Sequence, residues 1–421
     1  MILPKWPDPT KFHHIELGLD RMLKLLNRLG NPHLKLPPTI HIAGTNGKGS
    51  TLAFIKNIYQ SAGFVVHRYT SPHLIEFNER IEIAGKEISD YYLKKYLKIC
   101  YEACEQSPRI EATFFEATTA VAFLAFSNHF ADILLLETGM GGEFDATNVL
   151  PKVMQSIITP ISFDHQQYLG KTLSKIAIAK AGIIKKNCPI ISSDQEEEAL
   201  KVIQEIAKQN NSPLYITNDF IFKSNLDLNK IKIPLYGEHQ KQNAITAICS
   251  IKQQNHFKIT DQHIILGIEN TRWKARLEKI TQGKLFKKLN KNFQLFLDGS
   301  HNLQGAKTIK EFLKNSNFNK KIIIFQMMED KDCHGFLKEI YEFCDLIFIN
   351  SGLVGKKFHD CHELKKIIEN FDVKCQICEN FSMIFEEINQ KFANEKTFAK
   401  NNLVLITGSL YQASEFLILN K

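Results

Sequence analysis

The chain has 421 residues, of which 44% are hydrophobic and 23% charged, the composition of a globular protein long enough for two domains. Its net charge of +8 comes from 53 basic and 45 acidic residues scattered along the chain, which favours a site for anions over a nucleic-acid-binding surface. The nine cysteines have no framework spacing, which is typical of reduced thiols and predicts a cytoplasmic protein.

The first half of the chain alternates between strand-like and helix-like runs. Met1 to Pro9 has no basic region leading into an apolar one, so we expect no signal peptide. Apolar residues at three- and four-residue spacing predict a helix over 12–29, which Gly30-Asn31-Pro32 ends. Strands are then expected at 39–43, 65–69, 133–137 and 153–159, and helices at 50–62 and 116–130. This alternation predicts βαβ units on a mostly parallel sheet with helices on both faces.

A polar, basic segment at 280–292 is typical of a linker or a surface hairpin, and we place a domain boundary there. The predicted domains are 1–285, an N-terminal P-loop ATPase domain, and 286–421, a smaller Rossmann-like α/β domain without a phosphate loop. Strands of the second domain are expected at 293–297, 321–325, 346–350 and 403–407. The longest apolar stretch, 117–126, has about half of the ~20 residues needed to cross a bilayer, so we expect a buried helix and no membrane partner.

A glycine-rich loop, Gly44-Thr45-Asn46-Gly47-Lys48-Gly49-Ser50, lies between a predicted strand and a predicted helix. Backbone N–H groups at such a helix N-terminus can wrap phosphate oxygens, with the lysine along the β- and γ-phosphates and a hydroxyl toward Mg²⁺. The common P-loop has glycine where Ile42 stands and no residue between the lysine and the hydroxyl. A plain glycine-rich turn is the alternative, but the strand-loop-helix context favours nucleotide binding.

Polar residues follow several of the predicted strands directly. They are the phosphate loop, Ser71-Pro72-His73, Glu137 and Asp164-His165. Ligands of open α/β sheets bind outside the carboxyl ends of the strands, so four strand ends are expected to meet at one site. Glu137 ends a buried strand, a position from which a carboxylate can hold the metal of a nucleotide site.

With the motifs around these residues, the chain resembles the folylpolyglutamate synthase and dihydrofolate synthase family, relatives of the Mur ligases. The resemblance covers nearly the whole chain and rests on Gly44-Thr-Asn-Gly-Lys-Gly-Ser50, Ser71-Pro-His-Leu74, Phe115-Glu116, Glu137-Thr-Gly-Met-Gly-Gly142, Asp145-Ala-Thr-Asn148, Asp164-His165, Ala179-Lys-Ala-Gly-Ile183, Asn243-Ala244, Arg276-Leu-Glu278 and Asp298-Gly-Ser-His-Asn302.

The resemblance implies two Mg²⁺ ions, the first held by Ser50, Ser71 and Glu137. Glu137, His165 and a carbamylated Lys180 would hold the second. Hard cations prefer oxygen ligands, and a carbamate offers oxygens where an ammonium would repel the metal. Without the resemblance, Lys180 would be taken for a surface charge and His165 for a core histidine.

The resemblance also implies roles in substrate binding. Arg276, Asp298 and His301 would act on the nucleotide and the incoming amino acid, and Asn243 would contact adenine. Ser409 resembles a residue on the glutamate side. Thr113, Phe115 and Asp145 match positions around a pterin ring, which Phe115 would stack on and Asp145 would bind through hydrogen bonds. Core packing is the alternative for Phe115.

The implied enzyme is a monomeric, cytoplasmic ligase that uses ATP to join L-glutamate to a folate, and also to dihydropteroate, through an acyl phosphate. Catalysis would involve Lys48, His165, Lys180, Arg276 and His301. One alternative is a Mur-type ligase of cell-wall precursors, but 43 residues before Gly44 are too few for the substrate domain of those enzymes. A nucleic-acid-binding P-loop ATPase is another, and the chain shows no basic stripe with interleaved aromatic residues.

Overall fold

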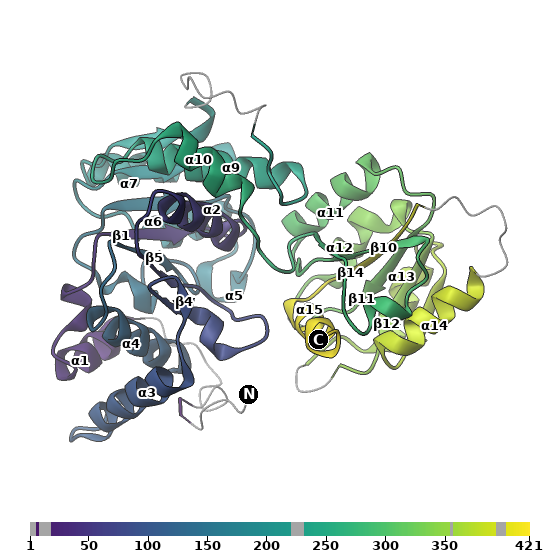
Figure 1. Cartoon of the computed structure of the whole chain (residues 1–421), viewed down its shortest axis with the longest axis horizontal. Helices are drawn as coiled ribbons and strands as arrows, with labels where there is room; N and C mark the ends of the chain where they lie inside the picture. Colours follow the sequence, from purple (N-terminus) through teal and green to yellow (C-terminus); the bar gives the residue numbers. More distant parts are fainter. Residues whose placement is uncertain (1–5, 8–17, 220–230, 354–356, 393–400) are drawn as a thin grey trace. The chain divides into compact units, whose positions relative to one another are not determined.

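The computed structural model describes residues 6–7, 18–219, 231–353, 357–392 and 401–421. The chain divides into two compact units, drawn from purple to green and from green to yellow in Figure 1. The first comprises Met1–Pro234 with His239–Thr271, and the second comprises Leu235–Glu238 with Arg272–Lys421. The second unit therefore begins before the boundary that the sequence predicts at 285, because a strand at 278–280 already pairs within the second sheet.

The first unit contains a sheet whose described strands run in the order β4-β3-β2-β5-β1-β6-β7-β8. All neighbours from β2 to β8 are parallel, whereas β3 and β4 add an antiparallel edge. The strands are β1 (Thr39–Ala43), β2 (Val66–Tyr69), β3 (Ile81–Ile83), β4 (Lys86–Glu87), β5 (Ile133–Glu137), β6 (Gln155–Ile158), β7 (Ile190–Ser192) and β8 (Leu214–Ile216). The predicted parallel sheet is confirmed, and β1 lies in its interior between β5 and β6.

Helices cover both faces of this sheet. In Figure 1, α1, α3 and α4 lie below the strands, and α2, α9 and α10 lie above them. The helices are α1 (Asp20–Arg28), α2 (Lys48–Ser61), α3 (Asp90–Glu105), α4 (Phe114–Ser127), α5 (Gln166–Leu169), α6 (Leu173–Ala181), α7 (Glu197–Gln209), α9 (Glu238–Lys252) and α10 (Asp261–Glu269). Short 3₁₀ turns occur at Pro32–Leu34, Phe77–Arg80 and Ala146–Val149.

The predicted apolar helix is α4, whose residues 116–126 are all buried. It packs with α1 and α3 in one hydrophobic core, and α6 and α7 pack in another. The helix predicted over 12–29 begins at Asp20 in the structure, and residues 12–17 lie outside the described ranges.

The second unit has a smaller sheet, of order β13-β12-β11-β14-β10-β9, with all neighbours parallel except β9. Its strands are β9 (Glu278–Ile280), β10 (Phe293–Leu297), β11 (Lys321–Phe325), β12 (Leu346–Asn350), β13 (Cys375–Cys378) and β14 (Asn402–Thr407). Its helices are α11 (Leu303–Asn315), α12 (Cys333–Ile340), α13 (Cys361–Glu369), α14 (Phe381–Lys391) and α15 (Leu410–Leu419), with 3₁₀ turns at Phe286–Lys288 and Tyr341–Phe343. The segment at 280–292 connects the antiparallel pair β9 and β10, so it is the hairpin rather than the linker.

All nine cysteines are free thiols, as predicted. Among the described residues, we find no helix long and apolar enough to span a bilayer.

Candidate active site

The phosphate loop leaves the carboxyl end of β1 at Gly44 and enters α2 at Lys48. Two of its glycines have backbone conformations and neighbours that exclude a side chain. Gly44 has φ of +151°, and a Cβ there would lie 1.9 Å from Thr159 Oγ1. Gly47 has φ of +89°, and a Cβ there would lie 2.4 Å from Asn243 Oδ1. Buried Asn243 on α9 thus packs against the loop. Its Nδ2 donates to Oε1 of Gln240 on the same helix.

The first part of the loop is fastened to the segment after β6. Thr45 and Asn46 donate their backbone N–H groups to the Pro160 carbonyl, at 3.0 and 3.4 Å. The Thr45 hydroxyl donates to the Ser162 carbonyl and accepts from the Ser162 amide, both at 3.0 Å. The N–H groups of α2's first turn, at Lys48, Gly49 and Ser50, have no acceptor within the helix, so they are the ones suited to phosphate oxygens.

Two lysine ammonium groups converge on the opening of the loop. Lys48 Nζ donates to the carbonyls of Gly44 and Thr45, at 3.0 and 3.2 Å. Lys180 lies on α6, far away in sequence, and its buried Nζ donates to the same Gly44 carbonyl at 2.9 Å. Burial, reinforced by the charge of Lys48, lowers the pKa of Lys180 to about 7. The sequence context of Lys180 alone favours a surface charge. The structure shows instead that Lys180 is buried.

Oxygen donors lie beside the loop on the neighbouring strand. β5 pairs with β1 so that Glu137 is the partner of Ile42, two residues before the loop. The Ser71 amide donates to Glu137 Oε2 at 3.3 Å, which brings the end of β2 to the same carboxylate. Glu137 and Ser50 are both buried. Carboxylate and hydroxyl oxygens are the ligands that Mg²⁺ prefers, so the side chains of Ser50, Ser71 and Glu137 fit such an ion in chemical type.

His165 begins the short helix α5 with a left-handed backbone, φ +49°. Its amide donates to its neighbour Asp164 at Oδ1 over 2.9 Å, and its Nε2 lies 3.9 Å from Asp164 Oδ2. Its side chain is 39% exposed, so the core-histidine alternative does not hold. The charge of Asp164 favours the protonated form of Lys180, which partly offsets the effect of burial on the pKa of that lysine.

The residues expected around the acceptor acid surround the loop 138–145, which follows β5. Phe115 lies against this loop, since a Cβ on Gly139 would be 2.5 Å from Phe115 Cζ. Both Asp145 oxygens accept hydrogen bonds within the chain. The Gly139 and Met140 amides donate to Oδ2 at 2.8 and 2.9 Å, and Thr147 donates to Oδ1. The carboxylate of Asp145 thus shapes the loop itself.

Thr113 is the N-cap of α4, next to Phe115. Its hydroxyl accepts from the Glu116 amide, and Glu116 in turn accepts from the Thr113 amide at 2.8 Å. This reciprocal arrangement is a capping box, and Arg21 on α1 pairs with the same Glu116 carboxylate at 2.8 Å. Thr113 therefore has a structural role in starting the helix that carries Phe115.

In the second unit, Arg276 is flanked by two residues with left-handed backbones, Ala275 at φ +54° and Leu277 at +48°. Asp298, buried at the end of β10, holds this segment by accepting the Leu277 amide at 2.9 Å. Its other oxygen accepts the Ser300 amide at 2.8 Å, next to His301. Asp298 therefore joins the segment of Arg276 to that of His301.

His301 and Ser409 each lie just after a strand of the second sheet. His301 Nδ1 is 3.2 Å from the Gly299 carbonyl. Ser409 is buried and caps α15, with its hydroxyl accepting from the Tyr411 amide at 3.1 Å. These residues occupy the carboxyl edge of their own sheet, the edge at which open α/β sheets bind ligands.

Thr159 and His41 support the loops of the site, and no sequence motif includes either residue. Thr159 closes the space beside Gly44, and His41 lies buried in β1 with its Nε2 2.8 Å from Thr147 Oγ1. A histidine in the middle of the buried run Thr39–Ala43 was the available signal, because a buried polar group needs a partner.

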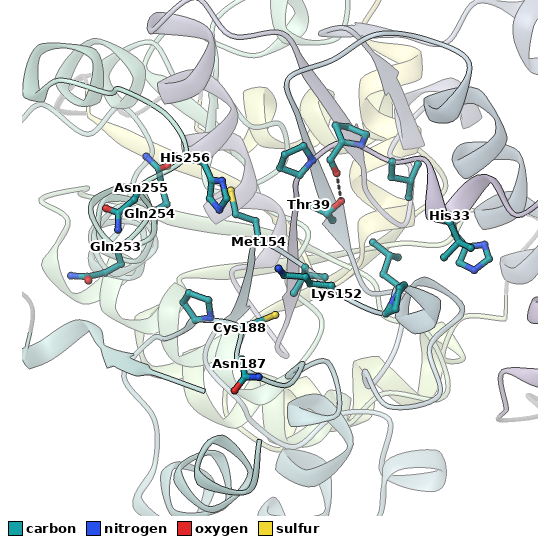
Figure 2. A pocket seen from close by; sticks show the side chains of 18 residues that line it. His33, Thr39, Lys152, Met154, Asn187, Cys188, Gln253, Gln254, Asn255 and His256 are labelled. Atoms are coloured by element: carbon teal, nitrogen blue, oxygen red, sulfur yellow. Dashed lines mark hydrogen bonds between the residues drawn. The ribbon is translucent and has the colours of Figure 1, made fainter. Parts of the chain in front are cut away.

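A cavity of about 530 Å³ occupies the opposite edge of the first sheet (Figure 2). Its lining includes Thr39, Met154 and Cys188, which lie at or just before the amino ends of β1, β6 and β7. None of the predicted site residues lines it. The cavity is thus separate from the loop at the carboxyl ends of the same strands.

Comparison with known proteins agrees with this geometry. Residues 42–251 match the family model of the Mur ligase middle domain, and residues 281–419 match that of the dihydrofolate synthetase C-terminal domain. A dihydrofolate synthase/folylpolyglutamate synthase of Bacillus subtilis is 34% identical over 95% of this chain and 94% of its own length. The dihydrofolate synthetase of Saccharomyces cerevisiae is 31% identical over 96% of this chain and 97% of its own length.

A solved structure of Mycobacterium tuberculosis folylpolyglutamate synthase, complexed with ADP and AMPPCP, superposes with a TM-score of 0.82 at 25% identity and covers 96% of both chains. The fold class predicted from the sequence is thereby confirmed for both units. The sequence matches extend over both units as well, so the resemblance is not confined to the phosphate loop. The chain therefore belongs to the dihydrofolate synthase/folylpolyglutamate synthase family of ATP-dependent ligases.

Proposed function

We propose that this enzyme joins L-glutamate to the carboxylate of folates and of dihydropteroate, with ATP converted to ADP and phosphate. The observation that carries the proposal is the convergence of Lys48 and Lys180 on Gly44, at the mouth of a phosphate loop flanked by Glu137 and Ser71. The Lys48 ammonium beside helix N-terminal amides suits the phosphates of ATP.

The reaction proceeds in two displacements. An oxygen of the acceptor carboxylate attacks the γ-phosphorus, the bond to the β-phosphate oxygen breaks, and ADP leaves. The glutamate amine then attacks the acyl carbon, phosphate departs with the bonding electrons, and the amine loses a proton. The protein mainly positions reactants and balances charge in such a reaction. We assign this charge balance to Lys48 and Arg276. Asp298 and His301 would act on the nucleotide and the amino acid. Asn243 would contact adenine, and Ser409 would contact glutamate.

Two Mg²⁺ ions complete the proposed site, the first held by Ser50, Ser71 and Glu137 and the second by Glu137, His165 and Lys180. Bound Mg²⁺ would neutralise phosphate charge and orient the transferring group. Lys180 qualifies as a ligand only as a carbamate. Its burial supports this modification, because an amine must be unprotonated to add CO₂ and burial disfavours the ammonium form.

Use of both acceptors is supported by the relatives, since the Bacillus subtilis protein bears both activity names and the yeast protein bears the dihydrofolate synthetase name. We assign the pterin side of either acceptor to Phe115, Thr113 and Asp145, around the loop 138–145. The monomeric state and the cytoplasmic location stay predictions from the sequence.

The test is ADP release by the purified chain with Mg²⁺, with and without each substrate. We expect ADP only when an acceptor is present, and continuous turnover only when L-glutamate is also present, with one glutamyl unit added per ADP by mass spectrometry. Dihydropteroate and tetrahydrofolate are assayed separately, and activity with one alone would restrict the enzyme to that acceptor. Sustained ADP release that is indifferent to glutamate would refute the ligase function.

A further inference from the structure

His41 is a fully buried residue in the middle of β1, three residues before the phosphate loop. Burial, with a smaller effect of the Lys185 charge, lowers the pKa of its imidazole to about 3, so the ring is neutral at physiological pH. A neutral imidazole carries one N–H. Its Nε2 lies 2.8 Å from the hydroxyl of buried Thr147, whereas its Nδ1 has no hydrogen-bond partner among the residues that the structure describes.

The hydrogen bonds of Thr147 decide which ring nitrogen carries the proton. The Thr147 hydroxyl donates to Asp145 Oδ1 at 2.5 Å. A hydroxyl has a single proton to donate, so the contact with His41 must be one in which Nε2–H donates and the hydroxyl oxygen accepts. His41, Thr147 and Asp145 therefore form a directed chain of hydrogen bonds that ends on a carboxylate.

Asp145, at the end of this series of hydrogen bonds, holds the loop 138–145. Asp145 Oδ2 accepts the amides of Gly139 and Met140, so its position sets the backbone that directly follows Glu137. Gly139 is packed against the ring of Phe115. At its other end, the loop is packed against the helix of Lys180, since a Cβ on Gly142 would lie 2.7 Å from the Lys180 carbonyl oxygen.

We propose that His41 is a positioning residue of the ligase, which acts through Thr147 and Asp145 to fix the loop 138–145 in the shape that receives the acceptor acid. Consecutive hydrogen bonds in a low-dielectric interior polarise and strengthen one another. Loss of the first donor leaves the Thr147 hydroxyl without its partner and loosens the carboxylate that holds Gly139 and Met140. This inference rests on the proposed function, because its signature is binding of the acceptor acid.

The experiment compares three replacements of His41 under saturating glutamate. Gln can place an amide N–H near the position of Nε2, Asn places it nearer to that of Nδ1, and Leu has no donor. We expect His41→Leu and His41→Asn to raise KM for the acceptor about tenfold, the effect of one buried hydrogen bond of about 1.4 kcal/mol. KM for ATP should stay within about twofold, and His41→Gln should restore KM for the acceptor to within about threefold of the unchanged enzyme.

Thr147 provides an independent arm, which also serves if His41→Leu fails to fold. Thr147→Val removes the hydroxyl that links His41 to Asp145, and it should raise KM for the acceptor as His41→Leu does. Thr147→Ser keeps the hydroxyl and should not raise this KM. In the double variant with His41→Leu and Thr147→Val, the rise in KM for the acceptor should equal that of Thr147→Val alone, because both changes interrupt the same series of hydrogen bonds.

Several results would overturn the inference. They are an unchanged KM for the acceptor in His41→Leu, equal rises in KM for acceptor and ATP, no rescue by Gln, or additive effects in the double variant. These failures are distinct from failure of the proposed function, which would show in the unchanged enzyme as ADP release without dependence on acceptor and glutamate.

Discussion

Replacing His41 by Gln should flatten the pH dependence of the stability of the first unit between pH 7 and pH 5. In the native protein, burial lowers the pKa of His41 from 6.5 to about 3, so the imidazole of His41 stays neutral in the folded state between pH 7 and pH 5. The unfolded chain takes up the proton below its ordinary pKa. Acidification therefore favours unfolding, and stability is lost as the pH falls through 6.5. The linkage amounts to about 1.4 kcal/mol per pH unit well below 6.5, or about 2 kcal/mol from pH 7 to pH 5.

The assay is urea unfolding at pH 7 and pH 5, with the difference between the two compared in both proteins. The chain has two tryptophans, and Trp6 belongs to the first unit, where it packs on Tyr101 at 5.6 Å between ring centres. A Trp273→Phe background thus makes fluorescence report on the first unit. Burial also lowers the pKa of His33 and His67, but both are present in the two proteins and their effects cancel. Equal losses of stability in the two proteins would refute the assigned ionisation of His41.

Two further predictions concern the phosphate loop. Gly47→Ala should raise KM for ATP by about tenfold or more, because a left-handed alanine costs about 1–2 kcal/mol and its Cβ would collide with Asn243. The matched control is Gly63→Ala, because Gly63 has φ of +87° but no described residue within 4 Å of the added Cβ. This variant should lose similar stability and keep its KM for ATP. Equal KM effects in both variants would contradict the steric argument. Lys180→Ala should lose at least about a hundredfold in kcat and regain part of it with added acetate or propionate, whereas Lys175→Ala on the same helix should stay active. Full activity of Lys180→Ala would exclude the carbamate.

The architecture of both units and the family can be inferred from the pattern of amino acids alone. Residues 133–136 and 322–325 are uniformly apolar runs of four residues, and their composition and length indicate buried parallel strands. The motif residues follow such strands directly, and the carboxyl ends of parallel strands meet at one edge of a sheet. The phosphate loop and its neighbours could therefore be placed together from the order of the strands.

Other features depend on contacts between residues distant in sequence, which no local pattern records. Lys180 follows an alanine on a short helix and reads as a solvent-exposed charge, yet packing of α6 brings its ammonium 2.9 Å from the Gly44 carbonyl. The inclusion of residues 278–280 in the second unit likewise depends on β9 pairing with β10.

The series of hydrogen bonds from His41 through Thr147 to Asp145 likewise depends on contacts between residues distant in sequence. It spans 106 residues between His41 and Thr147 and exists only because β1 and the segment after β5 are packed together in the interior. The sequence sets which side chains are available, and tertiary packing sets which of them lose water and must bond to one another.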